Sequence, residues 1–495
     1  DFITPEKWYF EGCNAPAAHN YKDSVLYVCG NPSGAMSILY TDNPKRGDWK
    51  AVPSVLHDLQ DPALFIDDDE RAYMYWGSSN RWPIRGKELD MKNKFLPIAK
   101  KPDSLLFLRP DIHGWERFGE NHTSDIKPFI EGAWMTKHNG KYYLQYAAPG
   151  TQFNVYGDGV YVGKSPLGPF EYAAHNPFCY KPGGFATGAG HGSTVCGPGG
   201  IYWHFGTIHL SINYKFERRL CMFPTFFDED GAMYSDTYFG DYPHYSPDQV
   251  SRQTTSGGFR GWMLLSYGKP VKASSQLESY PVENVTDENL KTFWVAEKND
   301  DKQWVEIDLE EVSDVYALQL NFFDYEETGF WGRMPNLRQR YLVEASVDGA
   351  RWRVLVDYRN SFRDAPHNYI ELDQPIEARY IRYRHHYVPG KNLAMGDIRV
   401  FGLGRGKKPA TVKGFTVVRE ADERNARISW KAVKGAQGYN VLWGVALDKL
   451  YSSWMVYGDN SLDLRALTVG QKYYFAIEAF NENGISQRVF LREAH

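Results

Sequence analysis

Aromatic strands that follow short polar turns recur through the first half of the chain. In each copy, a turn of Gly, Asn, Asp or Lys residues precedes a run of aromatic and aliphatic residues. The copies are YKDSVLYVCG at 21–30, FIDDDERAYMYWG at 65–77, KHNGKYYLQYA at 137–147, VCGPGGIYWHFG at 195–206 and the shorter FFDEDGAMY at 226–234. Repeated antiparallel units of this size are typical of a β-propeller. Residues 1–261 are therefore predicted to form five blades, in preference to a β-sandwich or several small β-domains.

The pattern changes after residue 262, where longer strands alternate apolar and polar positions. Residues 304–309 show this alternation, which is typical of a sandwich strand with one buried face. A segment rich in Gly, Lys and Pro at 404–414 marks a second boundary. Beyond it, Trp430 and Tyr439 lie on two successive predicted strands, which suits a small immunoglobulin-like sandwich over 408–494. The whole chain is thus predicted to be all-β.

Composition narrows the classes of partner. Aromatic residues make up 16% of the 495 residues, and rings of this kind can stack on sugar faces as well as fill a core. The net charge is −5 and the sequence has no basic block, so a nucleic-acid partner is not favoured. No apolar run is long enough to predict a membrane span. The sequence leaves the oligomeric state open.

Two acidic residues occupy the same place in successive units. Asp61 precedes Pro62 and Glu131 precedes Gly132, each just before an aromatic strand, and AGHGS at 189–193 also precedes one. Equivalent positions of propeller blades point to one axial pocket, so we expect the two carboxyl groups to converge. Glycoside hydrolysis requires two carboxyl groups in unlike environments, one protonated and one ionised.

Three tryptophans are candidate sugar-binding residues: Trp82, Trp134 and Trp203. Each has core packing as the competing interpretation, since a large ring is buried as readily as it is used to stack.

The segments DPALFIDDDERAYMYWG, IEGAWMTKHNGKYYLQYA and GHGSTV, in this order, resemble glycoside hydrolase family 43 over about residues 10–240. Members of this family are five-bladed propeller glycosidases. The resemblance implies that Glu131 is the general acid and that Asp61 orients it and raises its pKa. It implies that His191 lies near the pocket floor, where a calcium ion or a water is often bound; no other cofactor is expected. Arg219 would hold a sugar hydroxyl, with Arg218 as the alternative.

The sequence departs from the family at the residue that activates water. Family members usually carry an Asp-Pro pair in the first blade, and the corresponding pair here is Ala15-Pro16. Alanine cannot accept a proton. Asn14, Glu11 and His19 are the neighbours that can substitute, and Asn14 is also a candidate substrate-binding residue. The resemblance also implies that some members, notably exo-acting β-1,3-galactosidases, lack this aspartate.

The rest of the chain resembles accessory modules. VENVTDENLKTFW, QWVEIDL and ARYIRYR make residues 262–404 similar to a discoidin (factor 5/8 type C) domain, a jelly-roll sandwich that either binds sugar or acts as a spacer. Residues 408–494 look like a fibronectin type III domain, usually a spacer. These resemblances imply a modular secreted enzyme, periplasmic or extracellular, whose leader has been removed.

The leading hypothesis from the sequence is an exo-acting glycoside hydrolase. It would release a terminal arabinofuranose, xylose or galactose from the side chains of a plant-type polysaccharide or oligosaccharide. The alternative is a propeller that binds glycans without cleaving them, and Ala15 is the residue that favours it.

Overall fold

The computed structural model is built of β-strands. It describes residues 14–22, 25–31, 35–36, 38–52, 56–57, 59–99, 101, 103–209, 218–244, 261–323, 325–326 and 338–491. Within these ranges the only helices are single 3-10 turns, as the lack of an amphipathic helical run predicts. They are η1 (Pro44–Arg46), η2 (Met91–Asn93), η3 (Gly114–Glu116), η4 (Glu120–His122), η5 (Pro198–Gly200) and η6 (Val282–Val285).

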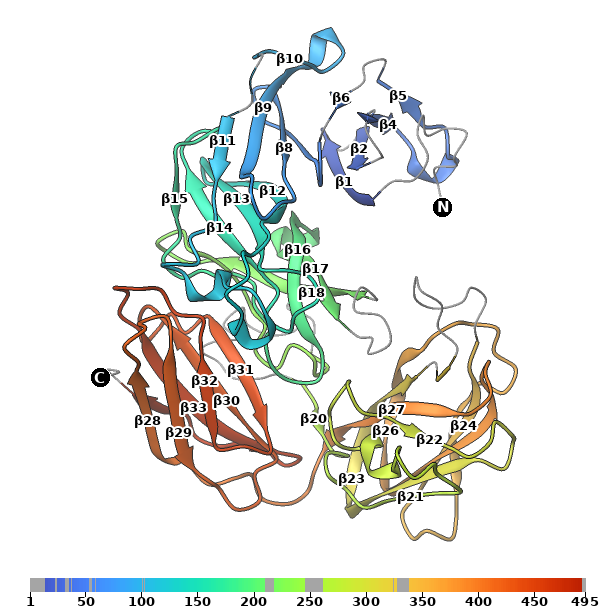
Figure 1. Ribbon diagram of the computed structural model, residues 1–495. Helices are drawn as coiled ribbons and strands as arrows, with labels where there is room; N and C mark the ends of the chain where they lie inside the picture. The colour runs from blue at the N-terminus through green and yellow to red at the C-terminus, as the bar shows by residue number, and fades with distance from the viewer. Residues whose placement is uncertain are drawn as a thin grey trace.

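Four antiparallel sheets follow one another along residues 14–235, from the dark blue first sheet to the green fourth in Figure 1. The first has β1 (Asn14–Tyr21), β2 (Val25–Asn31), β4 (Leu39–Thr41) and β5 (Lys50–Ala51), beside the pair β3 (Ala35–Met36) and β6 (Leu56–His57). The second has β7 (Ala63–Ile66), β8 (Ala72–Trp76), β9 (Ile84–Asp90), β10 (Leu96–Pro97) and β11 (Asp103–Leu106). The third has β12 (Glu131–His138), β13 (Lys141–Ala148), β14 (Gly157–Gly163) and β15 (Phe170–Tyr172), and the fourth has β16 (Thr187–Cys196), β17 (Tyr202–His209), β18 (Arg218–Phe227) and β19 (Met233–Ser235).

The five repeated units of the sequence occupy these four sheets. The prediction that each unit is a blade of its own is wrong for the last two, because 195–206 and 226–234 both belong to the fourth sheet. The segment 226–234 forms the hairpin of β18 and β19, in which Phe227 pairs with Met233. A fifth blade is not confirmed in the part of the chain that the structure describes.

The second group of strands spans residues 263–403 and forms one eight-stranded antiparallel sheet system. Its strands are β20 (Met263–Leu264), β21 (Val271–Ala273), β22 (Trp294–Val295), β23 (Trp304–Phe322), β24 (Arg340–Ser346), β25 (Arg353–Asp357), β26 (His367–Tyr387) and β27 (Ala394–Leu403). The alternation predicted at 304–309 is confirmed, since Val305, Ile307 and Leu309 are buried and the residues between them are not. These apolar side chains fill the interior of this sandwich.

The third group forms two sheets over residues 413–491. One has β28 (Lys413–Arg419), β29 (Ala426–Lys431) and β32 (Ser461–Leu464); the other has β30 (Gly438–Gly444), β31 (Ser452–Tyr457), β33 (Tyr474–Asn481), β34 (Gly484–Ile485) and β35 (Val489–Leu491). Trp430 and Tyr439 lie on successive strands from the two sheets, with ring centroids 5.1 Å apart. Both sheets face one apolar core, as in a β-sandwich, and the immunoglobulin-like assignment stays a prediction.

The third group is not a spacer, because its core is continuous with that of the blades. Trp115, Tyr146 and Tyr180 from the second and third sheets and their flanks share a cluster with Trp443 and Leu467. In Figure 1 this red sandwich lies directly beneath the third and fourth sheets. The spacer role that the resemblance implies for residues 408–494 is therefore corrected: residues 413–491 pack directly against the third sheet and its flanks.

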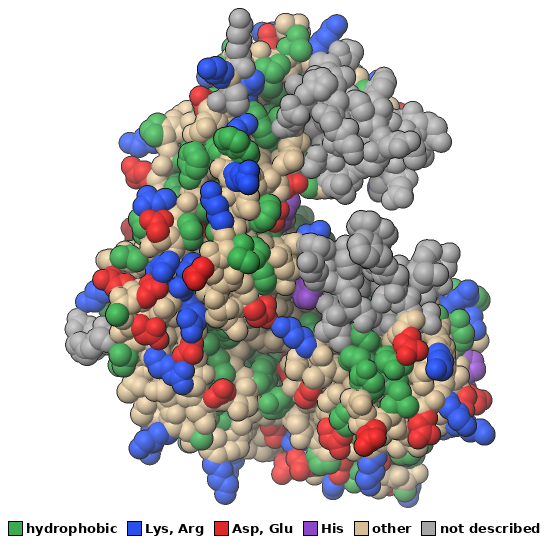
Figure 2. All heavy atoms as spheres, in the orientation of Figure 1, with side chains coloured by type: hydrophobic (Ala, Val, Ile, Leu, Met, Phe, Trp, Pro, Cys, Tyr) green, Lys and Arg blue, Asp and Glu red, His purple; other side chains and the backbone are tan. Residues whose placement is uncertain are grey.

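A second cluster joins all three groups of strands. Phe239, which follows the last blade strand, has its ring centroid 5.1 Å from that of Phe480, and Tyr242 lies 5.7 Å from Phe401 by the same measure. On the face shown in Figure 2, acidic and basic side chains are interspersed, and the coloured residues form no large field of one sign.

Candidate active site

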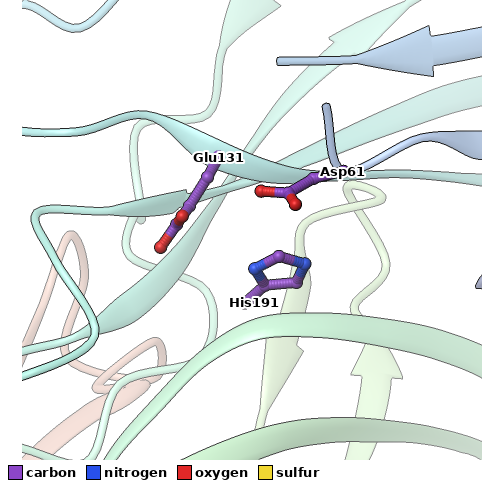
Figure 3. Close-up of side chains that lie close together, drawn as sticks. All are labelled: Asp61, Glu131 and His191. Atoms are coloured by element: carbon purple, nitrogen blue, oxygen red, sulfur yellow. The ribbon is translucent and has the colours of Figure 1, made fainter. Parts of the chain in front are cut away.

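Asp61, Glu131 and His191 come from three different sheets and lie together. Asp61 stands two residues before β7, Glu131 is the first residue of β12, and His191 lies within β16. One polar atom from each side chain lies within 4.8 Å of those from the other two. Figure 3 shows both carboxyl groups above the imidazole of His191. The structure thus brings the three residues together as the sequence predicts, while their roles in a reaction stay predictions.

The backbone at these positions adopts a conformation that L residues rarely take. The φ angles are 50° at Asp61 and 52° at His191, and Gly132, beside Glu131, has a φ of 64°. The ladders of β12 and β16 shift register at Glu131 and His191, as they do at a β-bulge. Such strain costs free energy and is found at functional sites, where it aims side chains inward.

Ala15 has the same backbone conformation in the first sheet. Its φ is 45°, and it lies at the register shift between Asn14 and Ala17 of β1. The position is therefore the first-sheet counterpart of Asp61. The structure keeps the strained geometry there and places an alanine in it, which supports the sequence interpretation that the usual aspartate is missing.

Two hydroxyl groups hold the carboxylate of Glu131. The buried Tyr156 donates a hydrogen bond of 2.5 Å to Oε1, and Ser78 donates one of 3.2 Å to Oε2. Burial first, and then the charge of Glu131, raise the pKa of Tyr156 well above its ordinary value, so its hydroxyl remains a donor at neutral pH. Sequence reasoning missed both donors, because each lies in a loop between strands without a motif.

The carboxyl group of Asp61 is shifted toward its protonated form. Burial raises its pKa above the ordinary value of 3.8, the positive charge of His191 opposes this shift, and the negative charge of Glu131 adds to it. A hydrogen bond from Ser78 and the charge of Arg218 act in the lowering direction. The like-charge effect predicted for this pair is thus present at Asp61; that Asp61 raises the pKa of Glu131 stays a prediction.

A fully buried carboxylate fixes the position of His191. Asp158 accepts hydrogen bonds from the backbone N–H groups of His191 at 2.9 Å and Gly192 at 2.8 Å. Its other partner is His204, whose Nε2 lies 3.1 Å from Oδ2. A Cβ on Gly192 would lie 2.2 Å from this nitrogen, so only glycine fits there. No motif in the sequence marks Asp158, because its contacts with His191 and Gly192 form between two sheets.

Of the three candidate tryptophans, one is exposed as a stacking residue must be. Trp82 is 63% exposed in the loop between β8 and β9. Trp134 donates from its indole to the carbonyl of Thr194 and so joins β12 to β16. Trp203 packs against Gly197 in the turn at the far end of the β16–β17 hairpin from His191. Trp134 and Trp203 are half-buried and make these packing contacts, and sugar binding stays a prediction for all three tryptophans.

Of the two candidate arginines, Arg218, the alternative residue, is the one whose charge acts on Asp61; which of the two holds a sugar hydroxyl stays a prediction. The charge of Arg218 lowers the pKa of Asp61, and its guanidinium donates to Thr151 at 3.0 Å. Arg219, the residue first predicted, donates to the carbonyl of Arg218. The two are neighbours in β18, so their side chains point to opposite faces.

The candidates for replacing Ala15 differ in what the structure shows of them. His19 accepts a hydrogen bond of 3.3 Å from the backbone of Ile66, and burial lowers its pKa to about 4, so it serves the packing of β1 on β7. Asn14 begins β1, but its side chain lies outside the described part of the chain, as does Glu11.

The three clustered residues fit calcium poorly. Calcium takes six to eight oxygen ligands, whereas Asp61, Glu131 and His191 include an imidazole nitrogen, and both Glu131 oxygens already accept hydroxyl hydrogen bonds. A cation among them would also hold both carboxyl groups ionised, against proton donation.

Two family profiles match the chain. The profile of glycosyl hydrolases family 43 matches residues 2–233, and that of the F5/8 type C domain matches residues 270–395. Residues 2–233 are thus a family 43 domain and residues 270–395 an F5/8 type C domain, which confirms both resemblances. The fibronectin type III resemblance of residues 408–494 stays a prediction.

Curated relatives match part of the chain. A beta-xylosidase of Xylanibacter ruminicola is 33% identical over 23% of this chain and 39% of the relative. An arabinoxylan arabinofuranohydrolase of Bacillus subtilis is 30% identical over 34% of each. A beta-D-galactofuranosidase of Aspergillus niger is 27% identical over 35% of this chain and 44% of the relative. The chain spans less than half the length of these relatives.

The likeness to solved structures is weak. One described as a glycoside hydrolase has a TM-score of 0.42 and 18% identity, over 81% of this chain and 86% of the other. A likeness at this level does not bear on activity.

Proposed function

We propose that this chain is an exo-acting glycoside hydrolase in which Glu131 protonates the leaving glycosidic oxygen. The convergence of Glu131, Asp61 and His191 from three sheets of a family 43 domain carries the proposal. The names of the relatives point to a terminal arabinofuranose, xylose or galactose as the sugar released. The substrate would be the side chains of a plant-type polysaccharide or oligosaccharide.

The hydrogen bonds of Glu131 suit a proton donor. When the carboxyl group gives its proton to the leaving oxygen it becomes a carboxylate, and the hydroxyls of Tyr156 and Ser78 are already aimed at its two oxygens. Donors placed before the reaction stabilise the charge that develops without reorganisation. Asp61 is the neighbouring carboxyl group. Its pKa is raised in part by the charge of Glu131, so the protonation of each group depends on that of the other.

The same geometry limits what Asp61 can do. Inverting glycosidases keep their acid and base about 6.5–9.5 Å apart, so that a water fits between. Atoms of Asp61 and Glu131 lie within 4.8 Å of each other. Asp61 is therefore a positioning residue for Glu131 rather than the base across a water, and the proposal leaves the water-activating group unassigned.

A glycan-binding propeller without catalysis is the second candidate, and Ala15 is the observation that favours it. The first-sheet counterpart of Asp61 carries no group that can take a proton from water.

Turnover of nitrophenyl glycosides separates the two functions. The panel is the α-L-arabinofuranoside, β-D-xyloside, β-D-galactoside and β-D-galactofuranoside, with wild type and Glu131→Gln. We expect wild type to cleave at least one, and the variant to lose about 10²- to 10⁴-fold in kcat, the range for a general acid. The control is Glu171→Gln, an exposed glutamate on β15 of the same sheet, which should keep full activity. Absence of turnover on every glycoside, with glycan binding unchanged in Glu131→Gln, would establish the binder instead.

The domain content supports a secreted enzyme, periplasmic or extracellular, acting on a carbohydrate partner. The F5/8 type C domain is proposed to hold the protein on its glycan. No helix among the described residues is long and apolar enough to cross a membrane.

A further inference from the structure

The loop that follows β8 lies on the same face of the molecule as the active site. Successive strands of the second sheet are antiparallel, so the end of β8 lies beside the start of β7, where Asp61 stands. The loop then leads into β9 and contains the exposed Trp82. The segment that precedes Glu131 ends on this face as well.

The loop is fastened to the strand that carries the proton donor. Ser79 and Ile130 exchange two backbone hydrogen bonds of 3.0 Å, and the next pair of residues, Ser78 and Glu131, share a side-chain hydrogen bond. Four residues of extended chain reach at most about 14 Å, so Trp82 lies within the length of a short oligosaccharide from Ser78.

The turn itself is ordered. The hydroxyl of Ser79 accepts hydrogen bonds from the backbone N–H groups of Arg81 at 2.9 Å and Trp82 at 3.1 Å. The guanidinium of Arg85 lies over the indole, 5.5 Å from the ring centroid. One ring face is thus covered by a cation, which holds the indole in place by a cation–π interaction while the ring stays 63% exposed.

Trp82 borders a pocket of about 100 Å³ with a second exposed ring. Phe107, from the loop after β11, is 54% exposed and lines it. The polar walls come from Asn80, Arg81 and Lys127. Aromatic rings beside hydrogen-bonding side chains are the surface that a sugar ring needs, because its C–H face packs on the ring and its hydroxyls bond at the rim.

The charge of this pocket is of one sign. Arg81 and Lys127 line it and no carboxylate does, and none of the described acidic residues forms an ion pair with Arg81, Arg85 or Lys127. Unpaired guanidinium and ammonium groups beside a stacking surface are complementary to a carboxylate on the stacked ligand.

We infer that Trp82, Phe107, Arg81 and Lys127 form a subsite for an acidic sugar, a uronic acid unit of the glycan whose terminal residue is cleaved at Glu131. The inference rests on the proposed function and deepens it, since it makes the substrate an acidic rather than a neutral polysaccharide. The indole carries the sugar ring, and the two cations bind its carboxylate.

The test measures binding by the full chain carrying Glu131→Gln, so that no glycan is consumed. The probes are glucuronoxylan, polygalacturonate and a glucuronate-bearing arabinogalactan, each beside the same polymer with its carboxyl groups reduced to alcohols. At least one acidic polymer should bind roughly tenfold more tightly than its reduced form. Adding Arg81→Ala and Lys127→Ala should abolish this preference, and Trp82→Ala should weaken both forms by about two- to tenfold.

The control is Lys413→Ala with Lys434→Ala, two exposed cations of the C-terminal sandwich, which should change neither affinity. The inference is overturned if no polymer binds better in its acidic form, if the preference survives loss of both pocket cations, or if polyglutamate binds as tightly as the acidic glycan. Nitrophenyl glycoside turnover by wild type is read separately. Its presence beside a failed binding test overturns the subsite alone, whereas its absence overturns the proposed function.

Discussion

Asp61 combines an unfavourable backbone conformation with surroundings that disfavour an ionised carboxyl group. The φ of 50° costs conformational free energy, and burial beside Glu131 disfavours the charged form. Neither cost serves packing. A residue that a fold keeps under such strain is expected to serve function, and removing its charge should make the protein more stable and less active.

The variant Asp61→Asn tests this exchange of stability for activity, because the stability difference depends on pH. Because the folded state raises the pKa of Asp61 above its ordinary 3.8, the contribution of this group to stability is full below that pH and is lost as pH rises through the folded pKa. Asparagine does not ionise. We therefore expect the variant to have a higher Tm than wild type at pH 7, with a difference that shrinks toward pH 4, together with lower turnover. Thermal scans across this range make the comparison.

Asp125→Asn, an exposed aspartate, serves as the control and should show no such trend. A Tm difference for Asp61→Asn that is negative at pH 7, or constant with pH, would contradict the expectation.

Among the elements, the start of β12 is the place where backbone conformation affects the candidate active site most directly. Gly132 has a φ of 64°, and a Cβ built on it would lie 3.0 Å from Cα and Cγ of His191. Gly140, in the turn that ends the same strand, has a φ of 73° with nothing within 4 Å of its Cβ position. The two glycines share the left-handed conformation, which only a side chain would strain, and differ in what lies beside them.

Gly132→Ala and Gly140→Ala are therefore a matched pair. Each should lose roughly 1–2 kcal/mol of folding free energy from the left-handed conformation. Only Gly132→Ala should also displace His191 and lower kcat, by about tenfold to a hundredfold. Urea unfolding and glycoside turnover give the two readouts. Equal kcat values in the two variants would show that crowding at His191 does not matter.

The sequence predicts those parts of the molecule that depend on near neighbours. The turn Asn139-Gly140 has the positive φ angles, 47° and 73°, that this dipeptide favours, and it joins β12 to β13 as expected. The number of blades was less accessible, because a hairpin signature such as 226–234 does not say which sheet it joins. Local pattern likewise does not distinguish the exposed ring of Trp82 from the half-buried rings of Trp134 and Trp203.

The residues of the candidate active site likewise fall into those that the sequence predicts and those that it does not. Asp61 and Glu131 are recoverable because each lies at the start of a strand in a repeated unit, and His191 because its segment GHGSTV carries the family resemblance, although it lies within β16 rather than before a strand. Tyr156 and Asp158 are not, since Tyr156 reaches Glu131 across the third sheet and Asp158 reaches His191 between the third and fourth sheets. No spacing in the sequence marks such contacts.

At the scale of the whole molecule, the C-terminal sandwich is part of the body that holds the blades. Arg117 donates to the carbonyl of Arg465 at 2.7 Å, and Arg424 donates to that of Pro110 at the same distance. Lys449 pairs with Asp228 of the fourth sheet at 2.8 Å. With the shared apolar cluster, these contacts predict that the sandwich stays bound even when the chain is cut.

Limited trypsin digestion checks this. The connection after β27 contains the exposed Arg405 and Lys407, where trypsin can cut. The two fragments should still elute together in gel filtration under native conditions and separate only in denaturant. The variant Arg405→Gln with Lys407→Gln should resist cleavage at this connection. A C-terminal fragment of residues 408–495 that elutes alone from the native digest would contradict the prediction.

The cluster of Phe239, Phe401 and Phe480 has a consequence for how such a protein can be rearranged in evolution or by design. A module that is joined to its neighbours only by a flexible linker can be exchanged between genes without destabilising those neighbours. Here the rings that would be exposed by an exchange come from all three parts, so a chimera that imports blades from another enzyme must import their C-terminal partner with them.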